Sequence, residues 1–352
     1  MRILASAPAK VILFGEHYVV YGAPGLVAAI EPYNEMELDA KGSASPGLEY
    51  RSTIKENDVT VELLDSPASS ALRPSAPVHP YAALYRKLAD ELPRLQKLSV
   101  RAEVKSAWPL KGVGNSASLG AALAAGLRAL AGEKNITAEA LFLDAQAADE
   151  VAHGGGRPSG IDAAAAAYGR VMEFSKNFDK TDEPRIRPLK IAPMKDAGFI
   201  LIDTLKAQEK RGNTADLISA FAKSNGINKK PGEMSRSERA KIFDAYLPIQ
   251  MHAARALEQG HWETVGLLMD ENHKLVSRHG VSSPGIERAV AVCKSYGALG
   301  AKLSGAGGVG GVVIALARKK DIGRIQEALR VGGFMTYPFK LSEKGARATK
   351  ID

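Results

Sequence analysis

Two glycine-rich segments have the Gly-x-Gly-x-x-Gly/Ala spacing that often accompanies phosphate binding. The first contains Gly112, Gly114 and Ala117, and the second contains Gly305, Gly307 and Gly310. Small residues let a backbone approach a ligand closely. The segment after the first turn is rich in Ala and Leu and predicts a helix, whose free N–H groups attract anions. The first segment is therefore either a polyphosphate site or a tight strand-to-helix turn without a ligand.

The surroundings of these two segments exclude several familiar nucleotide folds. A dinucleotide-binding fold needs a strand before the turn, a helix after it, and then an acidic residue at the end of a second strand. Here a second helix is expected after the first segment, and a strand over residues 312–317 directly follows the second. A Walker-type Gly-x-x-x-x-Gly-Lys-Ser/Thr segment and the protein-kinase catalytic loop are both absent from the sequence. A hydride-transfer enzyme is also disfavoured, because neither glycine segment has the surroundings of a dinucleotide-binding turn.

Two charged residues stand out because of their apolar surroundings. Lys10 lies within residues 3–14, an apolar segment that predicts a strand, and its neighbours on both faces are apolar. It is either a functional cation or a surface lysine whose stem lies along apolar groups. Asp162 precedes an alanine run, where a lone aspartate is commonly a helix N-cap. The alternative is a catalytic carboxylate.

Composition predicts an ordinary globular protein of two domains, because the chain has 352 residues. The formal net charge is +8, but the basic residues form short scattered clusters without interleaved aromatics, so no nucleic-acid partner is expected. Cys293 is the only cysteine and lies in a helix-like segment, which favours a buried thiol in a reducing, cytoplasmic setting. Neither a signal peptide nor an apolar run of the ~18 residues that span a membrane is expected.

Strand-like and helix-like segments alternate in both halves of the chain, which predicts an α+β class. A polar stretch at residues 175–187 predicts a boundary between an ATP-binding and catalytic domain, residues 1–187, and a domain that closes the substrate cleft, residues 188–352. The expected strands are 3–14, 26–30, 34–38, 59–63, 98–105, 170–174, 198–203, 312–317 and 335–340. The expected helices are 79–92, 119–130, 137–153, 215–221, 237–258 (kinked or split at Pro248), 262–278 and 321–331.

Three segments in this order resemble the signature motifs of the superfamily of galactokinases, homoserine kinases, mevalonate kinases and phosphomevalonate kinases. They are Pro8-Ala-Lys-Val-Ile-Leu-Phe-Gly-Glu-His-Tyr-Val-Val-Tyr-Gly22, Gly112-Val-Gly-Asn-Ser-Ala-Ser118 and Lys302-Leu-Ser-Gly-Ala-Gly-Gly308. The continuation after Glu16 and His17 is most similar to that of mevalonate kinases. The resemblance spans most of the chain and is far more specific than either glycine segment alone.

This resemblance implies a two-domain small-molecule kinase, with an N-terminal domain like domain 2 of ribosomal protein S5 and a ferredoxin-like C-terminal domain. The implied reaction is ATP-dependent phosphorylation of (R)-mevalonate to 5-phosphomevalonate in isoprenoid biosynthesis, with Mg²⁺ as cofactor and a homodimer as assembly. Another acceptor is the alternative: phosphomevalonate, the 3-hydroxyl of mevalonate or a sugar. A catalytically silent nucleotide-binding relative is the third interpretation.

The resemblance also implies roles for individual residues. Asp162 matches the catalytic aspartate that takes or orients the proton of the substrate hydroxyl, and Lys10 matches the lysine beside it. Ser116 and Asp149 match the Mg²⁺ ligands. Residues that match the ATP phosphate turn are Gly112, Val113, Gly114, Asn115 and Ser116, and those near the acceptor pocket are Glu16, His17 and Thr214.

The sequence departs from the family pattern at several of these positions. Asn115 replaces a usual serine, and Asp149 is one methylene shorter than the usual glutamate. Val309 and Gly311 stand where glycine and cysteine are common. The loop 302–311 serves either phosphate contact or domain packing, and His17 is either a substrate contact or a structural histidine.

Overall fold

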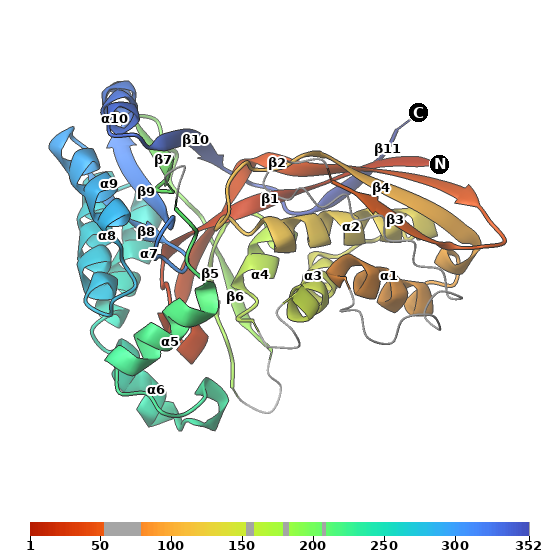
Figure 1. Cartoon of the computed structure of the whole chain (residues 1–352), viewed down its shortest axis with the longest axis horizontal. Coiled ribbons are helices and arrows are strands. Elements are labelled where there is room, and N and C mark those ends of the chain that lie inside the picture. Colours follow the sequence, from red (N-terminus) through yellow and green to blue (C-terminus); the bar gives the residue numbers. More distant parts are fainter. Residues whose placement is uncertain (53–78, 153–157, 179–182, 206–208, 352) are drawn as a thin grey trace. The chain divides into compact units, whose positions relative to one another are not determined.

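The computed structural model describes residues 1–52, 79–152, 158–178, 183–205 and 209–351 (Figure 1), so the strand expected at 59–63 lies outside the described residues. The chain forms two compact units. Unit 1 consists of residues 1–10, 29–170 and 342–352, and unit 2 consists of residues 11–28 and 171–341. The units do not coincide with the predicted division at residue 187, because two short segments each join the unit built mainly from the other half of the chain. The roles expected of the two domains stay predictions.

Unit 1 is a sheet covered by helices on one face (Figure 1), and its strands follow the order β11-β1-β2-β4-β3. β1 and β2 each continue into unit 2. The strands are β1 (Arg2–Phe14), β2 (Gly25–Gly42), β3 (Gly47–Arg51), β4 (Leu98–Ser106) and β11 (Arg347–Ile351). The helices are α1 (Pro80–Glu91), α2 (Asn115–Ala131), α3 (Ala138–Ala152), α4 (Ile161–Tyr168) and the short 3₁₀ helix η4 (Leu95–Lys97).

The alternation of side chains along β2 explains why the helices of unit 1 cover one face of the sheet. Met36 and Leu38 are completely buried, whereas Glu37 between them pairs with Arg2 and Lys105 on the other face. Successive strand residues point to opposite faces, so an apolar face forms for the helices and a charged face for solvent. Gly126 lets α2 approach closely, since a Cβ there would lie 2.6 Å from Leu38 Cδ1.

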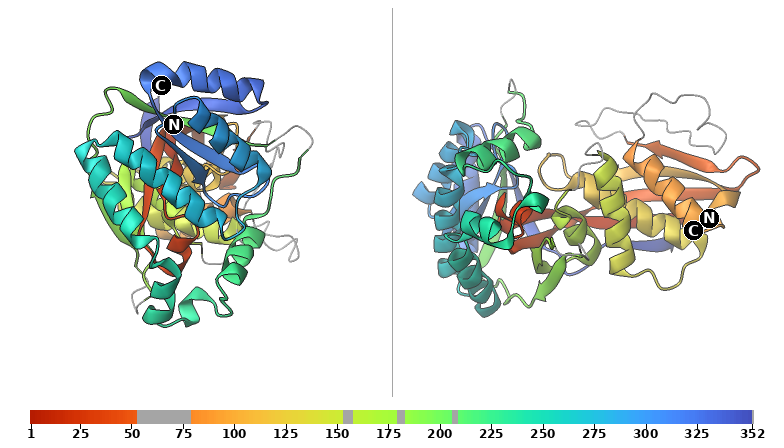
Figure 2. Two further views of the ribbon diagram at one scale, coloured as in Figure 1. Left: turned by 90° about the vertical axis from the view of Figure 1, so that its left-hand side faces the viewer. Right: turned by 90° about the horizontal axis from the view of Figure 1, so that it is seen from below.

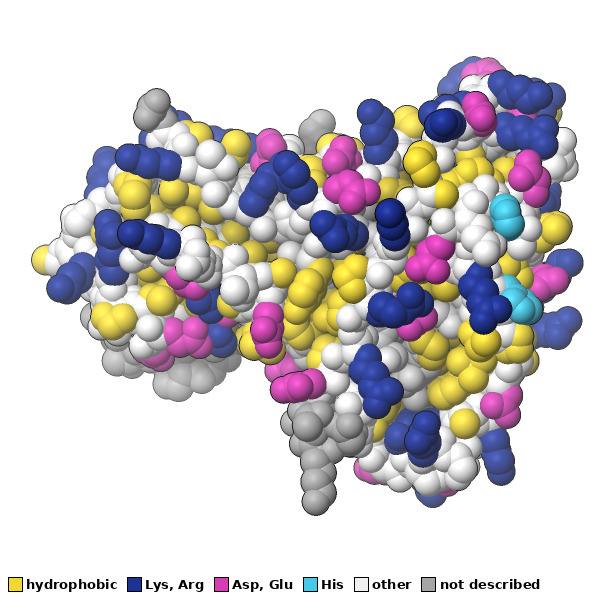
Figure 3. Space-filling model, turned by 180° about the vertical axis from the view of Figure 1, so that it is seen from behind, with side chains coloured by type: hydrophobic (Ala, Val, Ile, Leu, Met, Phe, Trp, Pro, Cys, Tyr) yellow, Lys and Arg dark blue, Asp and Glu magenta, His cyan; other side chains and the backbone are white. Residues whose placement is uncertain are grey.

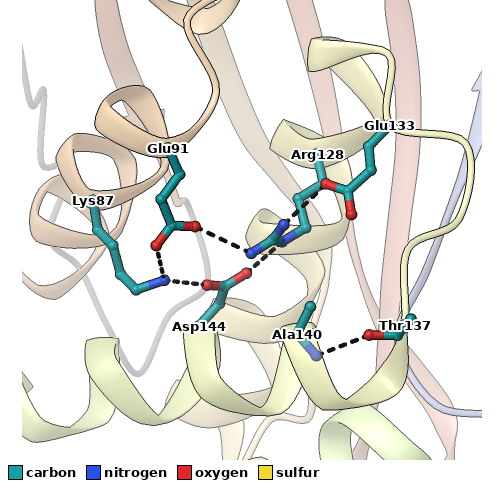
Figure 4. Close-up of polar contacts among 7 residues, drawn as sticks. All are labelled: Lys87, Glu91, Arg128, Glu133, Thr137, Ala140 and Asp144. Carbon is teal, nitrogen blue, oxygen red and sulfur yellow. Dashed lines mark hydrogen bonds and ion pairs between the residues drawn. The ribbon is translucent and has the colours of Figure 1, made fainter.

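A cluster of charged side chains lies between α1, α2 and α3 and joins them (Figure 4). The carboxylate of Asp144 is completely buried and accepts hydrogen bonds from Arg128 Nε at 2.6 Å and Lys87 Nζ at 2.7 Å. Glu133 accepts a further bond from Arg128 at 2.9 Å. Burial alone would lower the pKa of Arg128, but its bonds to Asp144 and Glu133 outweigh this and raise it. The cluster therefore ties three helices together through charges that partner one another.

Unit 2 contains an antiparallel sheet in the order β10-β7-β9-β8, and β5 pairs with β6 and with the first residues of β2. Its strands are β5 (Val171–Ser175), β6 (Arg185–Leu189), β7 (Ala197–Asp203), β8 (Gly300–Ser304), β9 (Val312–Arg318) and β10 (Met335–Leu341). Its helices are α5 (Thr214–Ser224), α6 (Arg236–Phe243), α7 (Leu247–Gln259), α8 (Trp262–Ser277), α9 (Pro284–Ser295), α10 (Lys319–Val331) and the 3₁₀ helices η1 (Tyr18–Tyr21) and η5 (Pro231–Glu233).

Helices α8, α9 and α10 pack on one face of the β10-β7-β9-β8 sheet, and α7 packs on α8 (Figure 2). β7 and β9 are buried along most of their length, as the uninterrupted apolar residues of both strands require. Cys293 lies on the buried side of α9 with no exposed surface, and burial raises the pKa of its thiol to about 12. The expectation of a buried cysteine is confirmed, and a thiol in this environment is inert.

The structure confirms most of the predicted elements, with instructive differences. The two strands expected at residues 26–30 and 34–38 are one continuous strand, β2, which passes through Pro32. The helix expected over 237–258 is split into α6 and α7, with Pro248 in the first turn of α7, where a missing N–H costs nothing. Thr137 caps α3 by accepting the Ala140 N–H at 3.1 Å.

Lys and Arg side chains are spread over the face shown in Figure 3 and are interspersed with Asp and Glu. This distribution agrees with the scattered basic clusters of the sequence. None of the helices in the described ranges combines the length and apolar character that crossing a bilayer requires.

Candidate active site

The predicted catalytic pair meets at the glycine turn of unit 1. Lys10 Nζ lies 3.2 Å from Asp162 Oδ1 and 3.4 Å from the carbonyl oxygen of Gly112. The Lys10 side chain is 6% exposed, whereas that of Asp162 is 33% exposed. The lysine is therefore a buried, fixed cation, and the carboxylate beside it remains reachable from solvent. The alternative of a surface lysine at position 10 is wrong.

Backbone contacts fix the turn against this pair. The Lys10 N–H donates to the carbonyl of Val113 at 2.8 Å, so β1 holds the turn directly. Gly114 adopts φ +74°, and a Cβ there would lie 2.9 Å from Lys10 Cγ and 3.3 Å from Asp162 Oδ2. Only glycine fits both the backbone conformation and the available space. Asp162 lies in the first turn of α4, whose N-cap is Gly160, so the N-cap interpretation of this aspartate is wrong.

Two oxygen donors suited to Mg²⁺ come from the start of α2 and from α3. Ser116 is an exposed residue, and its backbone carbonyl accepts a hydrogen bond from the Tyr81 hydroxyl at 3.1 Å. Burial, with a further contribution from the charge of Asp149 on α3, raises the pKa of Tyr81 well above its usual value. Ser116 thus contacts this tyrosine through its carbonyl, and the charge of Asp149 acts on the same hydroxyl. A hydroxyl and one carboxylate fit Mg²⁺, which takes its remaining ligands from phosphates and water.

No group of three His, Cys, Asp or Glu side chains able to hold a metal occurs in the described part of the chain. The described residues therefore provide no metal site built from three such side chains alone. A cation held jointly by the protein and a polyphosphate fits the donor set at Ser116 and Asp149.

In unit 2, Glu16 is bound to a lysine that sequence reasoning did not single out. Lys302 on β8 donates to the Glu16 carboxylate and to the carbonyl of Leu303, and both charged side chains are completely buried. Burial lowers the pKa of Lys302, and Glu16 opposes that effect. The first and third motifs are therefore joined by a buried ion pair. A direct contact between Glu16 and a substrate stays a prediction.

His17 is held in a defined position and protonation state in the same unit. Its ring stacks on Phe221 of α5 at 5.1 Å between centroids, and Nε2 lies 2.9 Å from the carbonyl of Ala306. A carbonyl only accepts, so Nε2 carries the hydrogen. His17 has φ +63°, which is uncommon for a residue other than glycine. Burial lowers its pKa to about 4, so the ring is neutral at physiological pH.

We expect His17 to make the free energy of unfolding depend on pH between 6.5 and about 4. The unfolded histidine takes up a proton near pH 6.5, but the folded one does so only near pH 4. Acidification through this window therefore favours the unfolded state, by up to about 3 kcal/mol. Urea denaturation of His17→Asn should show a correspondingly smaller loss of stability between pH 7 and pH 4 than the parent protein. Equal losses would contradict the assignment.

Thr214 is exposed and begins α5, where Asn213 caps the helix by accepting the Ala215 N–H at 2.9 Å. The segment just before it binds the second glycine-rich segment, which contains Gly305, Gly307 and Gly310. Arg211 forms an ion pair with the buried Asp203 at 3.1 Å and donates to the carbonyl of Gly310. The motif is thus engaged in packing within its unit, which supports the packing interpretation. The role of Thr214 at the acceptor stays a prediction.

The structure therefore brings together Lys10, Asp162 and the turn 112–116 in unit 1, the unit that also contains Asp149. Glu16, His17 and Thr214 lie in unit 2. Sequence reasoning missed Lys302 and Tyr81. Lys302 had the same signal that drew attention to Lys10, a lysine inside an apolar strand, whereas Tyr81 had no local signal.

Comparison with known proteins defines the class. The family model for the N-terminal domain of GHMP kinases matches residues 80–170, and that for the C-terminal domain matches residues 253–332. The mevalonate kinase of Aeropyrum pernix is 31% identical over 353 residues, which cover 97% of each chain. This chain belongs to the GHMP kinases, and its α+β two-domain fold is confirmed.

Within that family, this chain is similar to mevalonate kinases over almost its whole length. A crystal structure of L. major mevalonate kinase in complex with R-mevalonate has a TM-score of 0.73 and 26% identity, covering 96% of this chain and 94% of that one. Lactococcus lactis galactokinase complexed with galactose has a TM-score of 0.72 and 18% identity, covering 99% and 95%. The second similarity shows the fold alone.

Proposed function

We propose that this protein transfers the γ-phosphoryl group of ATP to the 5-hydroxyl of (R)-mevalonate, giving ADP and 5-phosphomevalonate. The observation that carries the proposal is the contact of Lys10 with Asp162 at 3.2 Å, directly against the glycine turn. The mevalonate kinases matched over the full chain support this acceptor.

Each group has a task that its position supports. The hydroxyl oxygen forms a bond to the γ-phosphorus, the bond to the ADP oxygen breaks, and the hydroxyl proton passes to the Asp162 carboxylate. Lys10 provides a fixed positive charge where negative charge develops. The free N–H groups at the start of α2 and the turn 112–116 would bind the phosphates. Phosphoryl transfer depends mainly on such positioning and charge neutralisation.

Ser116 and Asp149 are the residues we propose to hold Mg²⁺. A bound Mg²⁺ neutralises phosphate charge and orients the triphosphate. Glu16, His17 and Thr214 are proposed to shape the acceptor pocket. The neutral His17 ring would recognise polar groups without contributing a charge.

The homodimer and the cytoplasmic setting expected from the sequence remain predictions. Light scattering after size-exclusion chromatography tests whether the protein is a homodimer.

A coupled assay of ADP release tests the function. We expect rapid, Mg²⁺-dependent turnover with mevalonate and little turnover with phosphomevalonate or galactose at the same concentrations. The product should be identified as the 5-phosphate rather than the 3-phosphate by NMR. Turnover on one of the other acceptors would reassign the substrate. ATP binding without turnover on any of them would favour a catalytically silent relative.

A further inference from the structure

Asn115, where the family commonly has serine, uses its side-chain amide within unit 1. Its Nδ2 donates to the carbonyl of Trp108 at 2.9 Å and to that of Leu110 at 3.1 Å. Its Oδ1 accepts a bond from Nδ2 of Asn34 at 3.1 Å. An asparagine amide has two N–H donors, so both are occupied by the segment that leads into the glycine turn. The side chain has no N–H left to donate to a phosphate.

Asn34 on β2 is completely buried, and its amide is bonded at each group. Its Oδ1 accepts the Trp108 N–H at 2.9 Å, and its Nδ2 donates to Asn115 and to Ser118 Oγ at 3.0 Å. Ser118 in turn donates to the carbonyl of Ala7 on β1 at 3.0 Å. The result is a continuous relay from β1, through Ser118, Asn34 and Asn115, to the segment before the glycine turn.

The bonds of the relay fix the orientation of both amides. The Trp108 N–H can only donate, so Asn34 must present its oxygen there and its nitrogen to Asn115. Asn115 must then present its oxygen to Asn34 and its nitrogen to the two backbone carbonyls, which can only accept. Each amide group in the relay thus has a hydrogen-bond partner of the opposite kind, a donor facing an acceptor. A serine at position 115 has a single O–H donor and can satisfy only one of the two carbonyls.

We propose that Asn34 and Asn115 are positioning residues for ATP, which set the shape of the 108–114 segment so that the turn 112–116 presents its backbone N–H groups to the phosphates. This inference rests on the proposed function, because it assumes that the turn binds ATP. Neither side chain is proposed to touch the nucleotide. Asn115 acts through the segment, and Asn34 acts through Asn115 and Trp108.

The test compares Asn115→Ser and Asn34→Ser with the parent protein by ATP titration and steady-state kinetics. Each variant should raise the Kd and KM for ATP by about tenfold, the effect of losing one to two buried hydrogen bonds. KM for mevalonate and kcat at saturating ATP should change by less than about threefold, since the acceptor groups and Asp162 are untouched. A change confined to thermal stability, or an equal rise in both KM values, would overturn the proposal.

Two further measurements separate positioning from general destabilisation. Because the residues act in one relay, Asn34→Ser/Asn115→Ser should weaken ATP binding by clearly less than the product of the single effects. Gln96→Ser is the matched control, since it removes an exposed amide-to-carbonyl bond of 2.8 Å to Ala89 in the same unit, and should leave the Kd for ATP unchanged. Parent protein that binds no ATP would instead refute the proposed function itself. ATP binding by either serine variant within twofold of the parent would refute only the relay.

Discussion

Asp162→Asn is expected to lower kcat by about 10²–10⁴-fold while leaving the Kd for ATP within a few-fold of the parent value. The amide keeps the size of the side chain and a contact with Lys10, but it cannot accept the hydroxyl proton. In the proposed mechanism Asp162 acts on the acceptor hydroxyl, and the substitution leaves the turn 112–116, which would hold ATP, otherwise intact. Stopped-flow or coupled kinetics together with ATP titration measure both quantities.

Asp321→Asn is the control for this experiment. Asp321 also lies in the first turn of a helix, α10, so its substitution reproduces any effect of removing a negative charge from a helix N-terminus. We expect near-normal turnover for Asp321→Asn. Near-normal turnover for Asp162→Asn as well would remove Asp162 from the mechanism and return it to the role of a helix-terminal charge.

Asp144→Ala is expected to lower the free energy of unfolding by about 3 kcal/mol, at the low end of the range for breaking a buried ion pair. Removal of the carboxylate leaves Arg128, whose side chain is 10% exposed, without its 2.6 Å partner. The low end applies because Arg128 keeps Glu133 and because Lys87 is 35% exposed and can be hydrated. Guanidinium denaturation followed by circular dichroism measures the change.

Glu327→Ala supplies the comparison for Asp144→Ala. Glu327 pairs with Arg330 along the surface of α10, and both side chains are more than 60% exposed. Solvent-exposed pairs of this kind contribute about 0–1 kcal/mol. If the two alanine variants lost equal stability, the cluster in Figure 4 would be an ordinary surface network rather than a tie between α1, α2 and α3.

The sequence carried enough information to predict the class and the centre of the site. Lys10, Asp162 and the turn at 112–116 each belong to a motif with a physical reason for its residue types, and the structure brings them together. Long helices and buried strands were also predictable, because their apolar periodicity is local. The role of Asn34 was not predictable, because it depends on hydrogen bonds to Trp108 and Asn115, which are distant in the sequence.

Contacts between distant parts of the chain set the limit of prediction. The ion pair of Glu16 and Lys302 joins residues separated by 286 positions, and no local pattern pairs them. β11 was not predicted, because residues 347–351 include two exposed basic side chains and lack the apolar pattern of a buried strand. The interleaving of the units was missed because composition changes at residue 175, whereas the chain first leaves unit 1 after Lys10.

The pairing of β11 with β1 has a consequence for biosynthesis. Arg2 pairs with Ile351 and Ser6 with Arg347, so β1 pairs with a strand that is translated much later than β1 itself. Domains usually fold in the order of translation, but here one edge of β1 stays open until residues 347–351 have been translated. During that interval the open edge exposes unpaired backbone N–H and C=O groups, with which strands of other nascent chains can pair.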